Sequence, residues 1–244
     1  EQKTIWVIAN WKSNLSLSES LDWLSVVGPK IPATGHLKVV VCPRFSCLSE
    51  IKKEIQTHNY PIILGSQDIS PFDAGSFTGE EPAVLLKELV SLSIIGHSER
   101  RKYALETDEI INSKVKAVLR SGLGVIICVG EKSRKDENFQ ISVRDELRKN
   151  LAGISKRFSA KIMVAYEPIW TIGSGVAVKP EDLFEMATYI RRALLDLFGK
   201  NSAHKIPVLY GGSVDAKNAK TFLDVSGVNG LLVGGASLDA KEFK

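Results

Sequence analysis

The chain has 244 residues, a formal net charge of +4, and 44% hydrophobic and 25% charged residues, which is an ordinary globular composition. Lys and Arg are interspersed with Asp and Glu and form no basic stripe, so the composition argues against a nucleic-acid partner. No apolar run approaches the length of a membrane span, and the N-terminal apolar run is too short for a signal peptide.

Short runs rich in Val, Ile and Leu alternate with longer amphipathic stretches along the whole chain. The short runs predict strands near 4–9, 37–42, 61–65, 92–95, 125–129, 161–165, 207–210 and 230–233. The longer stretches predict helices near 17–27, 44–58, 80–90, 107–121, 137–157, 180–199, 216–225 and after 237. The strands are almost continuously apolar, which is typical of parallel strands covered by helices.

Eight strand–helix units in about 250 residues is the pattern of a closed (β/α)8 barrel. We therefore predict an α/β fold, a single-domain TIM barrel formed by residues 1–244. A doubly wound parallel sheet is the structural alternative, although it rarely needs eight equal units. No shift in composition and no linker indicates a second domain.

The connection at 66–79 is much longer than the usual four to six residues or so. It contains Pro71, two glycines and the phenylalanines Phe72 and Phe77, which an exposed loop would not ordinarily carry. An irregular surface loop packed on itself is one interpretation. We favour a protein partner that covers it.

The number and spacing of the cysteines indicate in which redox compartment of the cell the protein is found. Cys42, Cys47 and Cys128 are an odd number at spacings that match no zinc or redox motif. This pattern favours a reducing compartment, and we expect a cytoplasmic protein without a metal site.

Polar residues follow several predicted strands at their C-terminal ends, where barrel enzymes place catalytic groups. Asn10 and Lys12 follow the first strand, His97 and Glu99 the fourth, and Glu167 the sixth. Taken singly, each has an ordinary interpretation as a solvated lysine, a hydrogen-bonded histidine or a paired carboxylate. Together, an amide, an amine, an imidazole and a carboxylate at one rim indicate a catalytic site.

Glycine-rich segments follow the last two predicted strands, at Gly211-Gly212-Ser213 and Gly234-Gly235-Ala236. Gly-Gly pairs alone are usually turns. Without a Cβ, however, backbone N–H groups close to a helix start can approach a phosphate dianion. Barrel enzymes commonly hold phosphate in these two loops, so we predict a phosphate site here.

The chain resembles the triosephosphate isomerase family over essentially its whole length. The matching segments are Asn10-Trp11-Lys12, Gly96-His97-Ser98-Glu99-Arg100-Arg101, Ala165-Tyr166-Glu167-Pro168-Ile169-Trp170, Tyr210-Gly211-Gly212-Ser213-Val214 and Gly234-Gly235-Ala236-Ser237-Leu238. The resemblance implies interconversion of dihydroxyacetone phosphate and glyceraldehyde 3-phosphate through an enediol(ate), in glycolysis and gluconeogenesis, without a cofactor or metal.

The resemblance also implies a role for each polar residue. Glu167 would be the base that moves a proton between adjacent carbons, and His97 the neutral electrophile that polarises the carbonyl. Lys12 would attract the phosphate and stabilise the developing oxyanion. Asn10 would hydrogen-bond that oxygen, and Glu99 would organise Lys12 and His97.

The resemblance further implies a lid with hinges at 168–170 and 176–178 and a tip at 171–175. The implied substrate- and phosphate-binding residues are Gly173, Ser213, Gly234, Gly235, Ile172, Leu232 and Gly211. Closure of Ile172 and Leu232 would desolvate Glu167, and we expect its pKa to rise.

A homodimer through the 66–79 loop is also implied, with Thr78 approaching Asn10 and Lys12 of the partner subunit. The chain ends slightly early for the family's final helix, so we expect a few further terminal residues.

Some positions depart from the commonest family pattern. Thr171 stands where alanine is usual, Val176 where lysine is frequent, Ser13 where a larger residue is usual, and Asp68 where asparagine is common. These departures bear on the lid and the interface, not on the reaction.

Two other functions stay open from the sequence. An aldolase would use Lys12 as a Schiff base, which borohydride trapping would reveal; the combination of His97 and Glu167 argues against it. A non-catalytic phosphate-binding or interaction protein could use the same fold, but the intact lid and base argue against that function.

Overall fold

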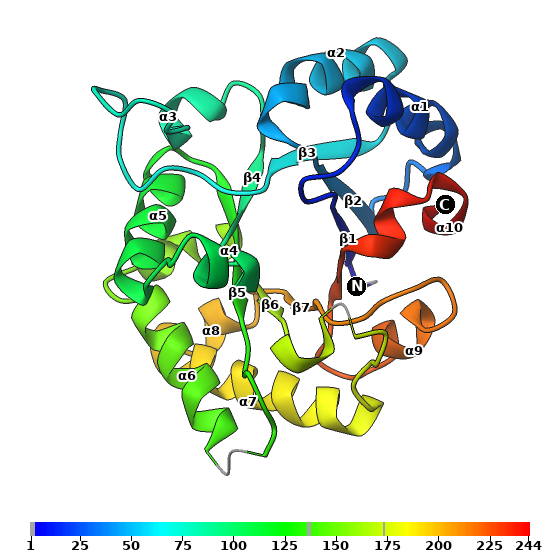
Figure 1. Cartoon of the computed structure of the whole chain (residues 1–244). Helices are drawn as coiled ribbons and strands as arrows, with labels where there is room; N and C mark the ends of the chain where they lie inside the picture. Colours follow the sequence, from blue (N-terminus) through cyan, green and yellow to red (C-terminus); the bar gives the residue numbers. More distant parts are fainter. Residues whose placement is uncertain (1–2, 136–137, 173) are drawn as a thin grey trace.

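The computed structural model describes residues 3–135, 138–172 and 174–244. Within these residues eight parallel strands close into a barrel in the order β1 to β8, and helices surround it (Figure 1). The predicted (β/α)8 barrel is therefore confirmed. The strands are β1 (Ile5–Asn10), β2 (Leu37–Cys42), β3 (Ile62–Ser66), β4 (Leu92–Ile95), β5 (Gly124–Val129), β6 (Ile162–Tyr166), β7 (Val208–Tyr210) and β8 (Gly230–Val233).

The helices follow the predicted order but several are shorter than expected. Those of the described residues are α1 (Leu17–Val27), α2 (Leu48–His58), α3 (Ala83–Leu86), α4 (Ser98–Tyr103), α5 (Asp108–Arg120), α6 (Phe139–Asn150), α7 (Pro180–Phe198), α8 (Lys200–Ala203), α9 (Ala219–Leu223) and α10 (Ala240–Phe243). The helix expected at 80–90 contracts to α3, because Pro82 is its N-cap and tighter turns follow Leu86. No helix was expected at α4 or α8.

The strands are continuously apolar in sequence because hydrophobic side chains are buried both inside the barrel and between the strands and the helices. In β5, Ile126 and Cys128 belong to a cluster inside the barrel. Their neighbours Val125, Ile127 and Val129 belong to a larger cluster between the strands and the helices. Because successive side chains of a strand point to opposite faces, both faces must be apolar when both are buried.

Local signals fix where the long helices begin. The Thr107 side chain accepts a hydrogen bond from Ile110 N–H, which caps α5, and Asp108 and Glu109 occupy its first turn. Ser16 and Glu19 form a reciprocal capping box at the start of α1. Pro180 occupies the first turn of α7, where its missing N–H costs nothing.

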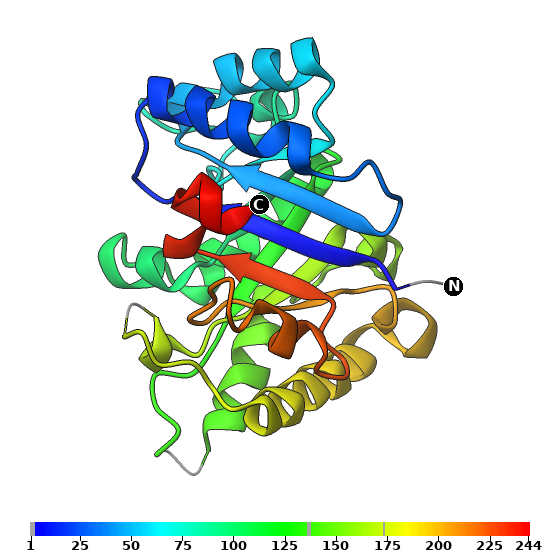
Figure 2. The same ribbon diagram turned by 90° about the vertical axis from the view of Figure 1, so that its right-hand side faces the viewer.

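The two ends of the chain meet where the barrel closes. β1 pairs with β2 on one side and β8 on the other, and the three strands run side by side (Figure 2). α10 lies against α1, and Trp23 of α1 packs against Phe243 of α10 with ring centroids 5.2 Å apart. Closure therefore brings the loop after β8 next to the loop after β1.

The 66–79 loop carries the phenylalanines that the sequence singled out. Phe72 and Phe77 stack with centroids 4.3 Å apart, yet 46% and 43% of their surfaces stay exposed. Thr78 is also exposed.

None of the helices in the described parts of the chain is long and apolar enough to span a bilayer.

Gly230 provides a test of the closure, because a Cβ there would lie 2.1 Å from the backbone oxygen of Trp6. We expect Gly230→Ala to destabilise the fold by at least about 2 kcal/mol, since β1 and β8 would have to separate. Urea unfolding measures the effect. Gly35→Ala is the control, because a Cβ at Gly35 meets nothing within 4 Å; equal stability of the two variants would contradict the argument.

Candidate active site

The carboxyl ends of the strands surround a cavity of about 560 Å³. The predicted residues that line it are Asn10, Lys12, His97, Glu167, Ile172, Gly211, Ser213, Leu232, Gly234 and Gly235. Glu99 lies in an adjoining cavity that Lys12 and His97 also line. Gly173 lies outside the described residues, and Thr78 lines neither cavity. The barrel thus brings together side chains from β1, β4, β6, β7 and β8.

Lys12 is held in a strained conformation at the rim. Its φ is +52°, in the left-handed region that a lysine rarely adopts. Its N–H donates to Asn10 Oδ1 at 3.1 Å, and Gln67 Nε2 donates to its carbonyl at 2.7 Å. Its Nζ pairs with Glu99 Oε1 at 2.6 Å. Contacts at both ends of the residue therefore fix where the ammonium group lies.

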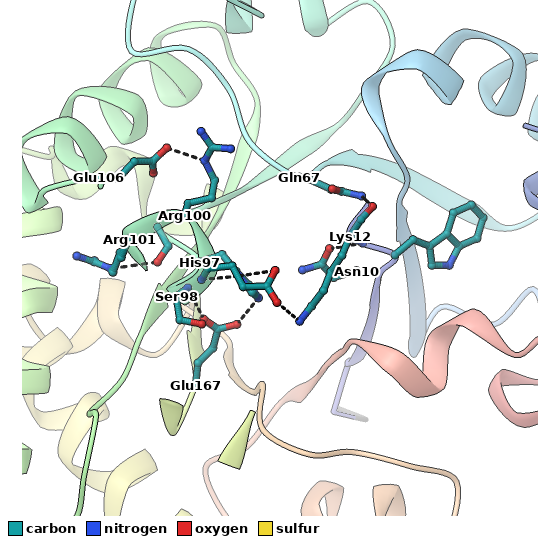
Figure 3. A network of polar contacts seen from close by, with 12 residues as sticks. Asn10, Lys12, Gln67, His97, Ser98, Arg100, Arg101, Glu106 and Glu167 are labelled. Atoms are coloured by element: carbon teal, nitrogen blue, oxygen red, sulfur yellow. Dashed lines mark hydrogen bonds and ion pairs between the residues drawn. The ribbon is translucent and has the colours of Figure 1, made fainter. Parts of the chain in front are cut away.

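His97 and Glu167 face each other directly (Figure 3). His97 Nε2 lies 3.0 Å from Glu167 Oε1, and Ser98 N–H donates to Glu167 Oε2 at 3.2 Å. The other ring nitrogen, Nδ1, accepts from the backbone N–H of Glu99 at 3.2 Å. That bond places the proton of a neutral ring on Nε2, the nitrogen that faces the cavity.

The pairing of these groups changes their pKa values. Burial acts to raise the pKa of Glu167, but His97, Ser98 N–H and Lys12 outweigh it, so the pKa is lowered. Burial acts to lower the pKa of His97, but the Glu167 carboxylate outweighs it, so that pKa is raised. The pKa of Glu167 is lowered here because the imidazole is its immediate partner, and the rise expected on closure over the base stays a prediction.

The backbone of Glu167 is fixed by its neighbours in the barrel. Its N–H donates to Val129 O at 2.8 Å, and the preceding Tyr166 O accepts from Gly211 N–H at 2.8 Å. A Cβ at Gly130 would lie 1.7 Å from Glu167 O, so only glycine fits there. The carboxylate therefore projects from a rigid strand end.

The segment after Glu167 is tied down by polar contacts on two sides. Glu131, which follows β5, accepts from Tyr166 Oη at 2.8 Å and from Trp170 Nε1 at 2.9 Å. Ser213 Oγ donates to Thr171 O at 2.7 Å. In this arrangement Ile172 lines the cavity together with Glu167 and Leu232.

The glycine loops serve two purposes. A Cβ at Gly211 would lie 3.1 Å from Glu167 Cγ, and one at Gly212 would lie 2.2 Å from the Tyr210 hydroxyl, so these glycines permit close packing. A Cβ at Gly235 would meet nothing within 4 Å, and one at Gly234 would lie 3.5 Å from Lys12 Cε. Gly234 and Gly235 thus line the cavity beside Lys12 with no side chain over their backbone.

Sequence reasoning missed several residues that shape the site. Gln67 bridges the carbonyl groups of Lys12 and Cys42, and Asn218 Nδ2 donates to Ser213 O. Gln67 directly follows β3, so the rule that identified the other residues could have found it. Asn218 lies well after β7 and carries no such signal. Among the residues described, no group of three or more His, Cys, Asp or Glu side chains could hold a metal ion.

Comparisons with known proteins agree with this geometry. The sequence model described as Triosephosphate isomerase matches residues 5–244. The chain belongs to the triosephosphate isomerase family. Proteins named triosephosphate isomerase include one from Dehalococcoides mccartyi that is 40% identical over 243 residues, which covers 99% of this chain and 94% of that protein. One from Geobacter metallireducens is 38% identical over 245 residues, covering 99% of this chain and 96% of that protein.

A buried ion cluster lies behind the site of this triosephosphate isomerase family member. Lys114 Nζ contacts Asp68 Oδ2 at 2.6 Å and Glu106 Oε1 at 2.5 Å, and Arg100 Nε contacts the same two oxygens at 2.8 and 2.6 Å. Asp68 Oδ1 and Glu106 Oε2 find no hydrogen-bond partner among the residues that the structure describes. Burial raises the pKa of Asp68 to about 6, with Lys114 opposing and Glu106 adding to the rise.

Asp68 therefore makes stability depend on pH. The folded pKa of Asp68 exceeds its unfolded value, so between about pH 4 and pH 6 the folded state holds a proton that the unfolded state has lost, and the free energy of unfolding falls as the pH rises through that range. We expect Asp68→Asn, which resembles the protonated acid, to stabilise the protein at pH 8 by as much as about 3 kcal/mol. Most of this gain should vanish by pH 4.5. Urea unfolding at fixed protein concentration measures both; a gain that did not fall with pH would contradict the argument.

Proposed function

We propose that the chain is a cofactor-independent triosephosphate isomerase that interconverts dihydroxyacetone phosphate and D-glyceraldehyde 3-phosphate. The observation that carries this proposal is the direct pairing of Glu167 and His97 at 3.0 Å, in one cavity with Lys12 and the two glycine loops. The whole of 1–244 acts as one catalytic domain, in glycolysis and gluconeogenesis. The family membership supports the same reaction.

The substrate phosphate would bind backbone N–H groups of Ser213, Gly234 and Gly235, joined by Gly173. The open space around Gly235 supports this placement, because a dianion needs close approach to N–H groups. The Lys12 ammonium adds a fixed positive charge beside Gly234. Binding energy from the phosphate, remote from the reacting carbons, can then be used to bring the lid over the site.

Proton transfer requires a base in a dry site. Glu167 is 2% exposed, and a carboxylate in water is too weak a base for a proton next to a carbonyl. We propose that substrate enters between Glu167 and His97 and separates them. Burial then becomes the main influence on the carboxylate and raises its pKa. The expected rise thus belongs to the substrate-bound state.

The remaining polar groups act on the oxygens. Glu167 takes a proton from one carbon and returns it to the adjacent carbon, so nothing is consumed. His97 Nε2–H polarises the carbonyl and moves the proton between the two oxygens. Lys12 and Asn10 stabilise the oxyanion, and Glu99 holds Lys12 through the 2.6 Å ion pair.

The same ion pair argues against the aldolase alternative. A Schiff base requires the lysine nitrogen to be free to attack a carbonyl carbon, whereas Lys12 Nζ is held 2.6 Å from Glu99 Oε1. A purely binding function would leave the buried pair of His97 and Glu167 without a purpose.

Homodimer formation through the 66–79 loop and a cytoplasmic location are part of the proposal. The exposed stack of Phe72 and Phe77 supports an interface there, since large exposed apolar side chains gathered in one loop mark interaction sites. Thr78 of this loop would approach Asn10 and Lys12 of the partner subunit.

The base is tested by Glu167→Gln, which keeps the shape and removes the proton acceptor. We expect kcat in a coupled isomerase assay to fall by roughly 10² to 10⁴. Glu50→Gln, on the exposed surface of α2, is the matched control and should retain full activity. Unchanged turnover in Glu167→Gln would overturn the proposed function.

The dimer is tested by light scattering at micromolar concentration. We expect twice the chain mass of 26.8 kDa. Phe77→Glu should shift the mass toward that of one chain and reduce activity, because a buried charge opposes association. A fully active native monomer would contradict the interface.

A further inference from the structure

Glu146 of α6 binds a peptide group directly behind the candidate base. Its Oε2 accepts a hydrogen bond from the Gly130 N–H at 3.2 Å. On the other side of that peptide group, the Val129 carbonyl accepts from the Glu167 N–H at 2.8 Å. A trans peptide points its N–H and its C=O in opposite directions, so this one group joins the Glu146 carboxylate to the backbone of Glu167.

Arg101 of α4 makes the corresponding contact behind His97. Its Nε donates to the carbonyl of Gly96, the residue that directly precedes His97, at 3.1 Å. Its Nη2 pairs with Glu146 Oε1 at 2.6 Å. The planar guanidinium makes both contacts at once from different nitrogens. The ion pair therefore connects the backbone that leads into His97 to the backbone that holds Glu167.

This connection is separate from the direct contact at the site, where His97 Nε2 lies 3.0 Å from Glu167 Oε1. Glu146 and Arg101 are not among the residues that line the two cavities at the site. Substrate that separates the imidazole from the carboxylate would therefore leave the connection behind them in place. The ion pair can hold the two segments together when the direct contact is lost.

The charged and titratable groups near Glu146 lie on several elements: Arg101 on α4, Asp108 on α5, Cys128 on β5, Lys149 on α6 and Glu167 after β6. Asp108 pairs with Arg101 at 2.8 Å and with Lys149 at 3.4 Å. Among the described residues, Arg101 is the cation that pairs with Glu146, whereas Asp108 has two. The ion pair with Arg101 is thus the main electrostatic contact of Glu146.

The strength of this ion pair depends on pH near neutrality. The Glu146 side chain is 16% exposed. Burial raises its pKa to about 7; Arg101 and the Gly130 N–H oppose that rise, while Asp108 and Glu167 add to it. Above this pH the carboxylate is ionised and pairs with Arg101, and below it the acid is neutral and the pairing is weaker.

We propose that Glu146 is a positioning residue for the isomerase reaction: together with Arg101 it holds the base Glu167 and the electrophile His97 at the spacing that proton transfer requires. It contacts no substrate and acts through the backbone of both residues. This inference rests on the proposed function, because it concerns the geometry of that active site. Catalysis depends steeply on the alignment of the reacting groups, so weakening the connection lowers kcat more than it changes KM.

The test compares the native protein with Glu146→Gln, which keeps the shape and resembles the protonated acid. At about pH 8.5 we expect kcat in the coupled isomerase assay to fall by roughly 3- to 10-fold, with KM for glyceraldehyde 3-phosphate changed by less than about 2-fold. At about pH 6 the two proteins should have similar kcat, because the native acid is then largely protonated. Asp145→Asn is the matched control: its side chain is 50% exposed at the neighbouring position of α6, and it should match the native protein at both pH values.

Arg101→Lys tests whether Glu146 acts through this arginine. One lysine nitrogen cannot replace the two guanidinium contacts, so adding Glu146→Gln in this background should lower kcat by less than it does in the native chain. Full additivity, or a ratio of native to Glu146→Gln kcat that is the same at both pH values, would overturn the inference while the native chain stays active. A Glu146→Gln protein that does not fold would also overturn it, because the native chain holds the protonated acid at about pH 6. An inactive native chain would instead overturn the proposed function, and the inference with it.

Discussion

Closure of the barrel between β1 and β8 is the constraint on which the rest of the structure depends. All eight described strands run parallel, so their carboxyl ends lie at one rim. Residues as distant in sequence as Asn10, His97 and Glu167 then line one cavity. The closure also needs a close approach of backbones at Gly230 and Trp6. Packing and chemistry are thus coupled, because a barrel that did not close would scatter the polar groups.

At the rim of the barrel, hydrogen bonds and close packing fix the backbone of Glu167 and Lys12, whose charged side chains interact with their neighbours. Glu167 projects from a strand end that Val129, Gly130 and Gly211 fix in place. Lys12 is held by Asn10 and Gln67 in a conformation it would not adopt alone. Burial alone would push the Glu167 carboxylate toward its neutral form, and pairing with His97 reverses that tendency. The ionisation of the base is therefore set by what lies opposite it.

Two of the departures from the commonest family pattern have physical consequences here. The Thr171 hydroxyl donates to Pro168 O within the first hinge, and Asp68 adds a carboxylate to a buried cluster with Lys114 and Arg100. Both lie outside the set of groups proposed to touch substrate. For Ser13 and Val176 the structure offers no comparable account.

The sequence by itself determined the fold class, the order of the strands and the rim positions of Asn10, Lys12, His97, Glu99 and Glu167. It could do so because burial on both faces leaves a continuous apolar run, and because residues directly after parallel strands share one edge. Only the tertiary structure decided the direction of the pKa shift of Glu167, the role of Gln67, and the contacts of Thr171 and Asp68. These depend on distances between segments far apart in the chain, such as the 3.0 Å between His97 and Glu167. Local patterns encode which face a residue occupies, but the strength of an interaction between two charges depends on their separation and burial, which the folded packing sets.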